Sequence, residues 1–171
     1  TITLGDEKGF IAKYSNTGNL IWQRTLSSLY EDKFLAVKTD SEYNVVVCGY
    51  TYKSATANTE DLLVAKYDYT GNLLWQITLD QVSADRGFGL ALDSDDQIYV
   101  TGRTLSPQAY GGSYDALLAK IDSEGDLLWQ KIIGGFDYDS AYNIAIDTDD
   151  YIYVSGETKD HDTGLYNILI A

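Results

Sequence analysis

The sequence predicts an all-β fold built from repeated four-stranded antiparallel sheets. A motif ending in tryptophan occurs three times, and Trp22, Trp75 and Trp129 are 53 and 54 residues apart (75 − 22 and 129 − 75). No stretch carries the apolar periodicity of a helix. A fixed period of this size is typical of propellers, solenoids and arrays.

The tryptophan motif predicts a β-hairpin in each repeat. Residues 62–67 and 73–79 are apolar and aromatic runs, and residues 68–72 between them contain Gly71, which tolerates positive φ. We expect the three tryptophans to be structural residues that pack between neighbouring units.

The second half of each repeat predicts two more strands. In the middle repeat these are residues 87–93, which are rich in glycine and alanine, and 97–104, with counterparts at 34–51 and 141–158. The small residues suit a crowded inner strand. Each unit therefore has four strands, A to D from the centre outward, as in the blade of a β-propeller. The matching glycines are expected to be structural: Gly49, Gly102 and Gly156.

The strands predict one propeller sector over residues 1–171, with permuted ends. The repeats lie at approximately 9–60, 61–114 and 115–166, with the start of a fourth at 167–171. Along the chain, the strands of successive blades follow the order C-D, A-B-C-D, A-B-C-D, A-B-C. Known propellers need about four or more blades. We therefore expect further blades from a longer chain or from homo-oligomerisation.

Composition argues against several classes of partner. The net charge of −14 would repel nucleic acid and anionic membranes, and no apolar run is long enough for membrane insertion. An acidic surface suits extracellular surroundings. Cys48 is the single cysteine, so no disulfide forms within the chain, and we expect it to be buried in a strand.

Residues 115–129, Gly134-Gly135 and residues 144–156 resemble the bacterial β-propeller repeat called SBBP. The resemblance covers nearly the whole chain. It implies a secreted or surface protein, and it implies no catalytic residues.

The predicted loops place candidate ligand-binding residues on one face. The B–C and D–A loops share that face and differ between repeats, which is typical of binding loops on a rigid scaffold. The candidates are Tyr30, Asp32, Tyr52, Asp85, Tyr110, Tyr114, Tyr138, Asp139, His161 and Tyr166. Asp32, Asp85 and Asp139 recur just before strand A, where they would line a channel mouth or accept backbone hydrogen bonds.

The A–B turns carry closely spaced carboxylates at Asp93, Asp95, Asp147 and Asp149. They are weak candidates for calcium, since they lack the glycine and the distant glutamate of an EF-hand loop. Aspartate is also common in hairpin turns for its own hydrogen bonds. We expect no other cofactor. His161 has no partners that would make a catalytic triad or a zinc site.

Three functions stay open. The first is a non-catalytic module of a secreted or surface protein that recognises a protein or a glycan through the variable face. The second is a purely structural unit of a cell-surface or virion appendage. The third is a hydrolase that uses the recurring carboxylates, which we rank last, so that we expect no enzyme.

Overall fold

The computed structural model describes residues 7–26, 31–53, 60–79, 84–105, 113–134 and 137–159, together with the backbone of 166–170. These parts of the chain form thirteen β-strands and no helix. The strands make four separate sheets, and hydrogen-bonded neighbours are antiparallel. The prediction of an all-β chain of antiparallel sheets is confirmed.

Within each sheet the strands follow chain order. The first sheet contains β1 (Phe10–Tyr14) and β2 (Leu20–Thr25). The second contains β3 (Asp32–Thr39), β4 (Val45–Tyr52), β5 (Glu60–Tyr67) and β6 (Leu73–Leu79). The third contains β7 (Asp85–Leu92), β8 (Ile98–Leu105), β9 (Tyr114–Ile121) and β10 (Leu127–Ile133). The fourth contains β11 (Asp139–Ile146), β12 (Ile152–Lys159) and β13 (Tyr166–Ile170). The proposed division into one sector and its repeat boundaries stays a prediction.

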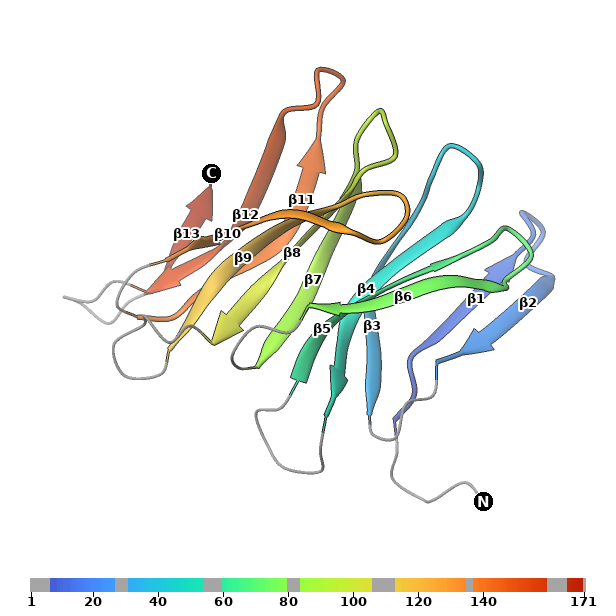
Figure 1. Cartoon of the computed structure of the whole chain (residues 1–171), viewed down its shortest axis with the longest axis horizontal. Helices are drawn as coiled ribbons and strands as arrows, with labels where there is room; N and C mark the ends of the chain where they lie inside the picture. The colour runs from blue at the N-terminus through green and yellow to red at the C-terminus, as the bar shows by residue number, and fades with distance from the viewer. Residues whose placement is uncertain are drawn as a thin grey trace.

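The sheets stand side by side along the long axis of the molecule, from β1 and β2 at one end to β11–β13 at the other (Figure 1). The first strand of a sheet packs against the preceding sheet, because β7 contacts β3, β4 and β5, and β11 contacts β7, β8 and β9. The core therefore lies between the sheets. Its largest cluster joins Val46, Leu62 and Val64 of the second sheet to Leu90 and Val100 of the third.

Two of the repeated tryptophans, Trp22 and Trp75, connect their sheet to the next one. Trp22 Nε1 donates a hydrogen bond of 3.1 Å to the carbonyl oxygen of Tyr69, and Trp75 Nε1 donates one of 3.0 Å to that of Ser123. Each indole also covers the glycine of the neighbouring C–D turn, since a Cβ at Gly71 would lie 2.9 Å from Trp22. The indole thus anchors one sheet on the turn of the following one.

The repeated strand-B glycines lie opposite a β-bulge. Strand A shifts register at Phe34/Ala36, Gly87/Gly89 and Ala141/Asn143. A Cβ on Gly49 would lie 1.8 Å from the carbonyl oxygen of Lys33, which no side chain tolerates. A glycine is therefore required wherever the bulged strand A crosses strand B this closely.

Cys48 is fully buried in β4, as predicted from its apolar surroundings. Burial raises the pKa of its thiol to about 12. A thiol with so high a pKa is protonated at neutral pH and therefore unreactive.

Candidate binding face

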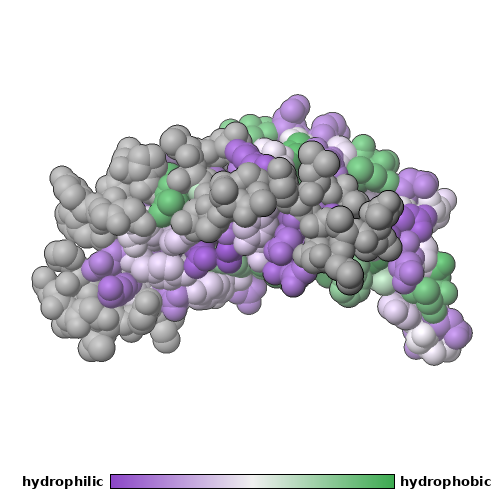
Figure 2. Space-filling model, turned by 90° about the horizontal axis from the view of Figure 1, so that it is seen from below, coloured by the Kyte–Doolittle hydropathy of each residue, from purple (hydrophilic) through white to green (hydrophobic). Residues whose placement is uncertain are grey.

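The long connections leave the sheets at one end, which we call the loop face. It comprises the first residues of β3, β5, β7, β9 and β11 and the last residues of β4, β8 and β12. The short hairpin turns lie at the opposite end, the turn face (Figure 1). Figure 2 looks onto the loop face, where much of the described surface beside the grey atoms is hydrophilic.

An arginine surrounded by aromatic rings lies on the loop face between the third and fourth sheets. Arg103 Cζ lies 4.3 Å from the ring centroid of Tyr114, 5.5 Å from that of Tyr138 and 5.7 Å from that of Phe88. Arg103 Nη1 also donates a hydrogen bond to the Tyr138 hydroxyl. We call these four residues the Arg103 group.

The rings of the Arg103 group hold one another in place. Tyr114 and Tyr138 pack edge to face, with centroids 6.0 Å apart and an interplanar angle of 66°. Edge-to-face pairs and cation–π contacts each contribute about 0.5–1.5 kcal/mol beyond simple burial. The group therefore presents half-buried, ordered side chains at the surface.

The Arg103 group continues toward the fourth sheet. Phe88 contacts Tyr142 at a centroid distance of 5.5 Å, and the Tyr142 hydroxyl donates a hydrogen bond to Glu157 Oε1. Burial and the hydrogen bond to the Glu157 carboxylate both raise the pKa of Tyr142. Tyr142 therefore keeps its proton and donates over the whole physiological pH range.

A second cation–aromatic cluster occupies the equivalent junction between the second and third sheets. Arg86 Cζ lies 4.5 Å from the Tyr50 ring centroid, and Arg86 Nη2 donates to Glu60 Oε1. Tyr50 and Tyr52 pack edge to face at 5.8 Å. Lys33 Nζ lies 6.0 Å from the Tyr50 ring centroid. We call these five residues the Arg86 group.

Charge is balanced inside the Arg86 group. Burial raises the pKa of Glu60, but the hydrogen bond from Arg86 and other nearby donors lower it by more, so that its pKa lies below the ordinary value. The Glu60 side chain is 3% exposed and that of Arg86 is 25% exposed. The pair is thus ionised and largely shielded, so Arg86 offers little free charge to a ligand.

The predicted tyrosines fall into these two groups where the structure describes them. Tyr114 and Tyr138 belong to the Arg103 group, and Tyr52 belongs to the Arg86 group. Tyr30, Tyr110 and His161 lie outside the described residues, as does the side chain of Tyr166. Their roles as ligand contacts stay predictions.

The three recurring aspartates are buried, whereas the sequence left open whether they line a channel mouth or accept backbone hydrogen bonds. Asp32, Asp85 and Asp139 are 1%, 0% and 3% exposed, and they begin strands β3, β7 and β11 instead of ending loops. Each aspartate pairs across the sheet with the repeated threonine at the end of strand B, at Thr51, Thr104 and Thr158. The two matching positions face each other within one blade, and the carboxylate at the first of them is buried in the protein.

The turn-face carboxylates organise their own hairpins. Asp93 Oδ1 accepts hydrogen bonds from the backbone N–H groups of Asp95 and Gln97, and Asp93 Oδ2 lies 3.2 Å from Lys120 Nζ. Asp147 likewise accepts from the N–H groups of Asp149 and Tyr151. The carboxylate oxygens of Asp93 and Asp147 are thus engaged by the protein itself, and calcium binding at these turns stays a prediction.

Other turn-face aspartates bridge neighbouring sheets. Asp96 accepts hydrogen bonds from the backbone N–H and the hydroxyl of Ser41, and Asp150 does the same for Ser94. Both aspartates adopt positive φ, at 59° and 61°, which aims the carboxylate at the preceding sheet. The repeated turns therefore contribute to contact between sheets.

In the described ranges, no three His, Cys, Asp or Glu side chains gather in a way that could hold a metal ion. A helix long and apolar enough to cross a membrane is likewise not found among the residues the structure describes.

The residues at the centre of both groups were missed from the sequence. Arg86 and Arg103 each lie beside a repeated residue, following Asp85 in strand A and Gly102 in strand B. Their equivalents differ between repeats: Lys33 and Ser140 for Arg86, Tyr50 and Glu157 for Arg103. The signal in the sequence was a position that differs between the three repeats and lies next to a position that is the same in all of them, near the loop face. Such a position could have been chosen as a candidate binding residue.

Comparison with known proteins identifies the type of fold. Residues 128–161 match the family model described as SBBP, beta-propeller repeat, which confirms the resemblance. The fold is a β-propeller. A solved protein of unknown function from Bacteroides caccae has the same fold, with a TM-score of 0.54 at 10% identity over 96% of this chain and 58% of that one.

Two curated proteins have similar sequences. An uncharacterized WD repeat-containing protein, L264, of Acanthamoeba polyphaga mimivirus is 27% identical over 59% of this chain. Regulatory protein FlaEY of Caulobacter vibrioides is 28% identical over 58% of it. The aligned parts make up 8% and 12% of those proteins, so the chain corresponds to a small part of either. These matches favour a repeat module of the binding or scaffold type.

Proposed function

We propose that this protein is a non-catalytic β-propeller module of a secreted or surface protein, and that it binds a partner protein through the loop face. The observation that carries the proposal is the Arg103 group. Arginine and tyrosine are the residues most enriched at the energetic centres of protein interfaces. Here they are half-buried and held by mutual contacts, and the position of Arg103 differs between repeats, with Tyr50 and Glu157 as its equivalents.

The order of the group favours binding. Tyr114, Tyr138 and Arg103 have already lost rotamer freedom in the free protein, because each packs on the others. Side chains that are ordered before binding cost less entropy when a partner arrives. An aromatic surface with polar tips suits a protein epitope, and it also suits the apolar face of a sugar, which makes a glycan the alternative ligand.

The test compares two variants, one that removes a large side chain from the loop face and one that removes a large side chain from the turn face. Arg103→Ala removes the centre of the Arg103 group. Tyr69→Ser is the matched control, because Tyr69 is 60% exposed on the turn face and serine occupies the same position at Ser123 in the next repeat. Wild type and both variants are immobilised to capture solubilised cell-surface proteins. In a second assay each of the three is applied in solution to a glycan array.

Proteins retained by wild type and by Tyr69→Ser, and lost with Arg103→Ala, would support the proposal. Glycans that follow the same pattern would assign the face to carbohydrate instead of protein. Equal retention by wild type and Arg103→Ala would contradict a binding role for this group.

The second candidate is a purely structural repeat unit of a cell-surface or virion appendage. The repeated inter-sheet hydrogen bonds of Asp96 and Asp150, together with those of Trp22 and Trp75, favour it because each junction between the described sheets contains at least one of them. A spacer of this kind would retain no partner in either arm of the experiment.

A further inference from the structure

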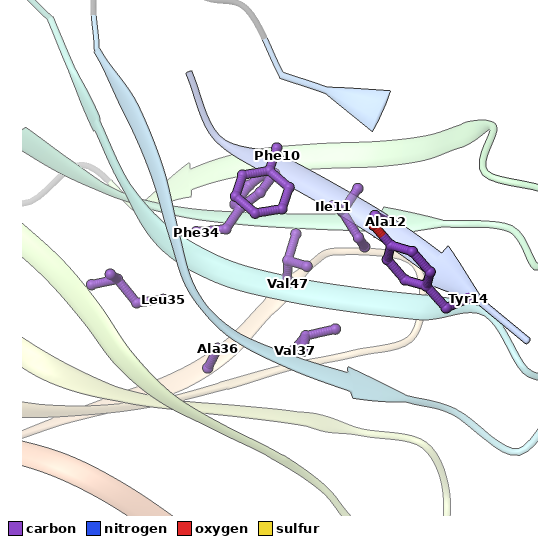
Figure 3. A pocket seen from close by; sticks show the side chains of 9 residues that line it. All are labelled: Phe10, Ile11, Ala12, Tyr14, Phe34, Leu35, Ala36, Val37 and Val47. Carbon is purple, nitrogen blue, oxygen red and sulfur yellow. The ribbon is translucent and has the colours of Figure 1, made fainter. Parts of the chain in front are cut away.

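An apolar groove lies between the first and second sheets. It has a volume of about 330 Å³ and is lined by Phe10, Ile11 and Tyr14 of β1, Phe34 and Val37 of β3, and Val47 of β4. Figure 3 shows these side chains between the two strands. The groove borders the edge of β1 that pairs with no strand in the described parts of the chain.

The residues of the groove occupy positions that are buried in the other repeats. Phe10 is 72% exposed, whereas its equivalents Leu63 and Leu117 are 2% and 0% exposed. In the third sheet the preceding sheet covers this position, since Leu117 shares one cluster with Val46 and Leu62 of the second sheet. Strand β1 has no sheet before it in the described parts of the chain, and neither a strand A nor a strand B lies beside it there. The groove therefore has the place of an A–B strand pair.

The opposite end of the molecule exposes the complementary surface. Tyr153 of β12 is 54% exposed, whereas its equivalents Val46 and Tyr99 are 0% and 4% exposed. Strand β13 pairs with β12 only from Ser155 to Lys159, so the edge of residues 152–154 is open in the described structure. The A–B pair of β11 and β12 thus has an incomplete strand C in the described structure.

A repeated ion pair is split between these two ends. In the second sheet Asp40 Oδ2 lies 2.9 Å from Lys66 Nζ, and in the third sheet Asp93 Oδ2 lies 3.2 Å from Lys120 Nζ. The same aspartate position in the fourth sheet is Asp147, and the same lysine position in the first sheet is Lys13. In the parts of the chain that the structure describes, neither has its counterpart within its own sheet.

Both halves already make the remaining contacts of the pair. Lys66 Nζ also donates to the carbonyl oxygen of Ser123 in the next sheet, and Lys13 Nζ donates to the equivalent oxygen of Tyr69 at 3.1 Å. Asp147 Oδ2 accepts from the Tyr153 hydroxyl at 2.8 Å, as Asp93 Oδ2 accepts from Tyr99. Each end is arranged to receive the missing charge.

We propose that the groove is filled by β11 and β12 of a second copy of this chain, so that Asp147 of one copy pairs with Lys13 of the other. Strand β1 then takes the place of β13 beside β12. The pairing of β8 with β9, where Thr101 faces Leu118 and Val100 faces Ala119, predicts the register: Ser155 faces Ile11 and Val154 faces Ala12.

The test reverses the two charges separately and together. Lys13→Glu places a carboxylate against Asp147, and Asp147→Lys places an ammonium group against Lys13. Each single variant is expected to weaken self-association of residues 1–171 by about tenfold or more, since close like charges across an interface repel. The double variant restores an opposite pair and is expected to associate within about threefold of wild type.

Two charge-matched controls separate this effect from net charge. Lys131→Glu on β10 and Asp149→Lys in the turn beside Asp147 change exposed groups that make no ion pair in the described structure. Both should associate as wild type does. Association is measured by sedimentation equilibrium, and far-ultraviolet circular dichroism reports whether each variant is folded.

Folded wild type that stays at 19.0 kDa at every concentration would overturn the proposal and assign the groove to strands of a longer chain. Folded single variants that associate as tightly as wild type would also overturn it. A double variant that fails to recover association would show that Asp147 and Lys13 do not meet.

Discussion

The indole of Trp75 lies over Gly125 of the following sheet and donates a hydrogen bond of 3.0 Å to the carbonyl oxygen of Ser123. Trp22 makes the same contact with Gly71 and Tyr69 one repeat earlier. The tryptophan of the first and of the second repeat thus contacts the turn of the next sheet in the same way. This repeated contact explains why the tryptophans are regularly spaced in the sequence.

Replacing Gly125 by alanine should lower the free energy of unfolding by roughly 2–4 kcal/mol. The added Cβ would lie 3.1 Å from Trp75, and the residue has a φ of 100°, which alanine adopts only with strain. Gly18→Ala is the matched control, since Gly18 has a φ of 82° and nothing within 4 Å of the added Cβ. Urea unfolding should give a clearly smaller loss for Gly18→Ala, and equal losses would deny the indole contact any role.

Asp85→Ala should destabilise the protein by about 1–3 kcal/mol, since it removes a buried polar group from the start of the inner strand. Asp95→Ala, in the exposed part of the A–B turn, should change the stability by less than about 0.5 kcal/mol. Both values come from urea unfolding. A silent Asp85→Ala variant would indicate that the recurring aspartate serves a ligand and not the fold.

The free energy of unfolding should fall when the pH drops below about 4, the usual pKa of carboxylates. Burial raises the pKa of Asp40, but the hydrogen bonds from Lys66 and Asn44 outweigh it and leave the pKa lowered; Glu60 is lowered through Arg86 in the same way. A lowered pKa in the folded state contributes stability that is present above the unfolded pKa and is lost as the pH falls through the folded one.

The urea midpoint measured at pH 7, 5 and 3 checks this dependence. The midpoint should change little from pH 7 to 5 and drop from 5 to 3, and Asp40→Asn should reduce the drop because asparagine does not ionise. An unchanged midpoint at pH 3 would contradict the assignment of these ion pairs.

Cys48 should report unfolding. Its thiol is buried and its pKa is raised to about 12, so a thiol reagent such as dithionitrobenzoate at pH 8 should react only when the protein opens. The reaction rate in native buffer should lie at least a hundredfold below the rate in 6 M guanidinium, and comparable rates would show that β4 is accessible.

The architecture was predictable because its determinants repeat in the sequence. The tryptophan spacing and the hairpin turns at Gly71 and Gly125 are local signals, and each recurs in register. The Arg103 group and the Arg86 group were less predictable, because Arg103 meets Tyr138 only when two sheets come together. The burial of Asp85 was missed for a related reason: its cross-strand partner Thr104 is distant in the chain, and the aspartate was assigned to a loop.

The most direct test of a binding role for the loop face is the affinity of one partner recovered with the wild-type protein. Surface plasmon resonance would compare wild type, Arg103→Ala and Tyr69→Ser as analytes over that immobilised partner. The account predicts that Arg103→Ala weakens binding by tenfold or more, about 1.4 kcal/mol or above, while Tyr69→Ser binds as wild type does. Unchanged affinity of folded Arg103→Ala, or an equal loss in Tyr69→Ser, would contradict it.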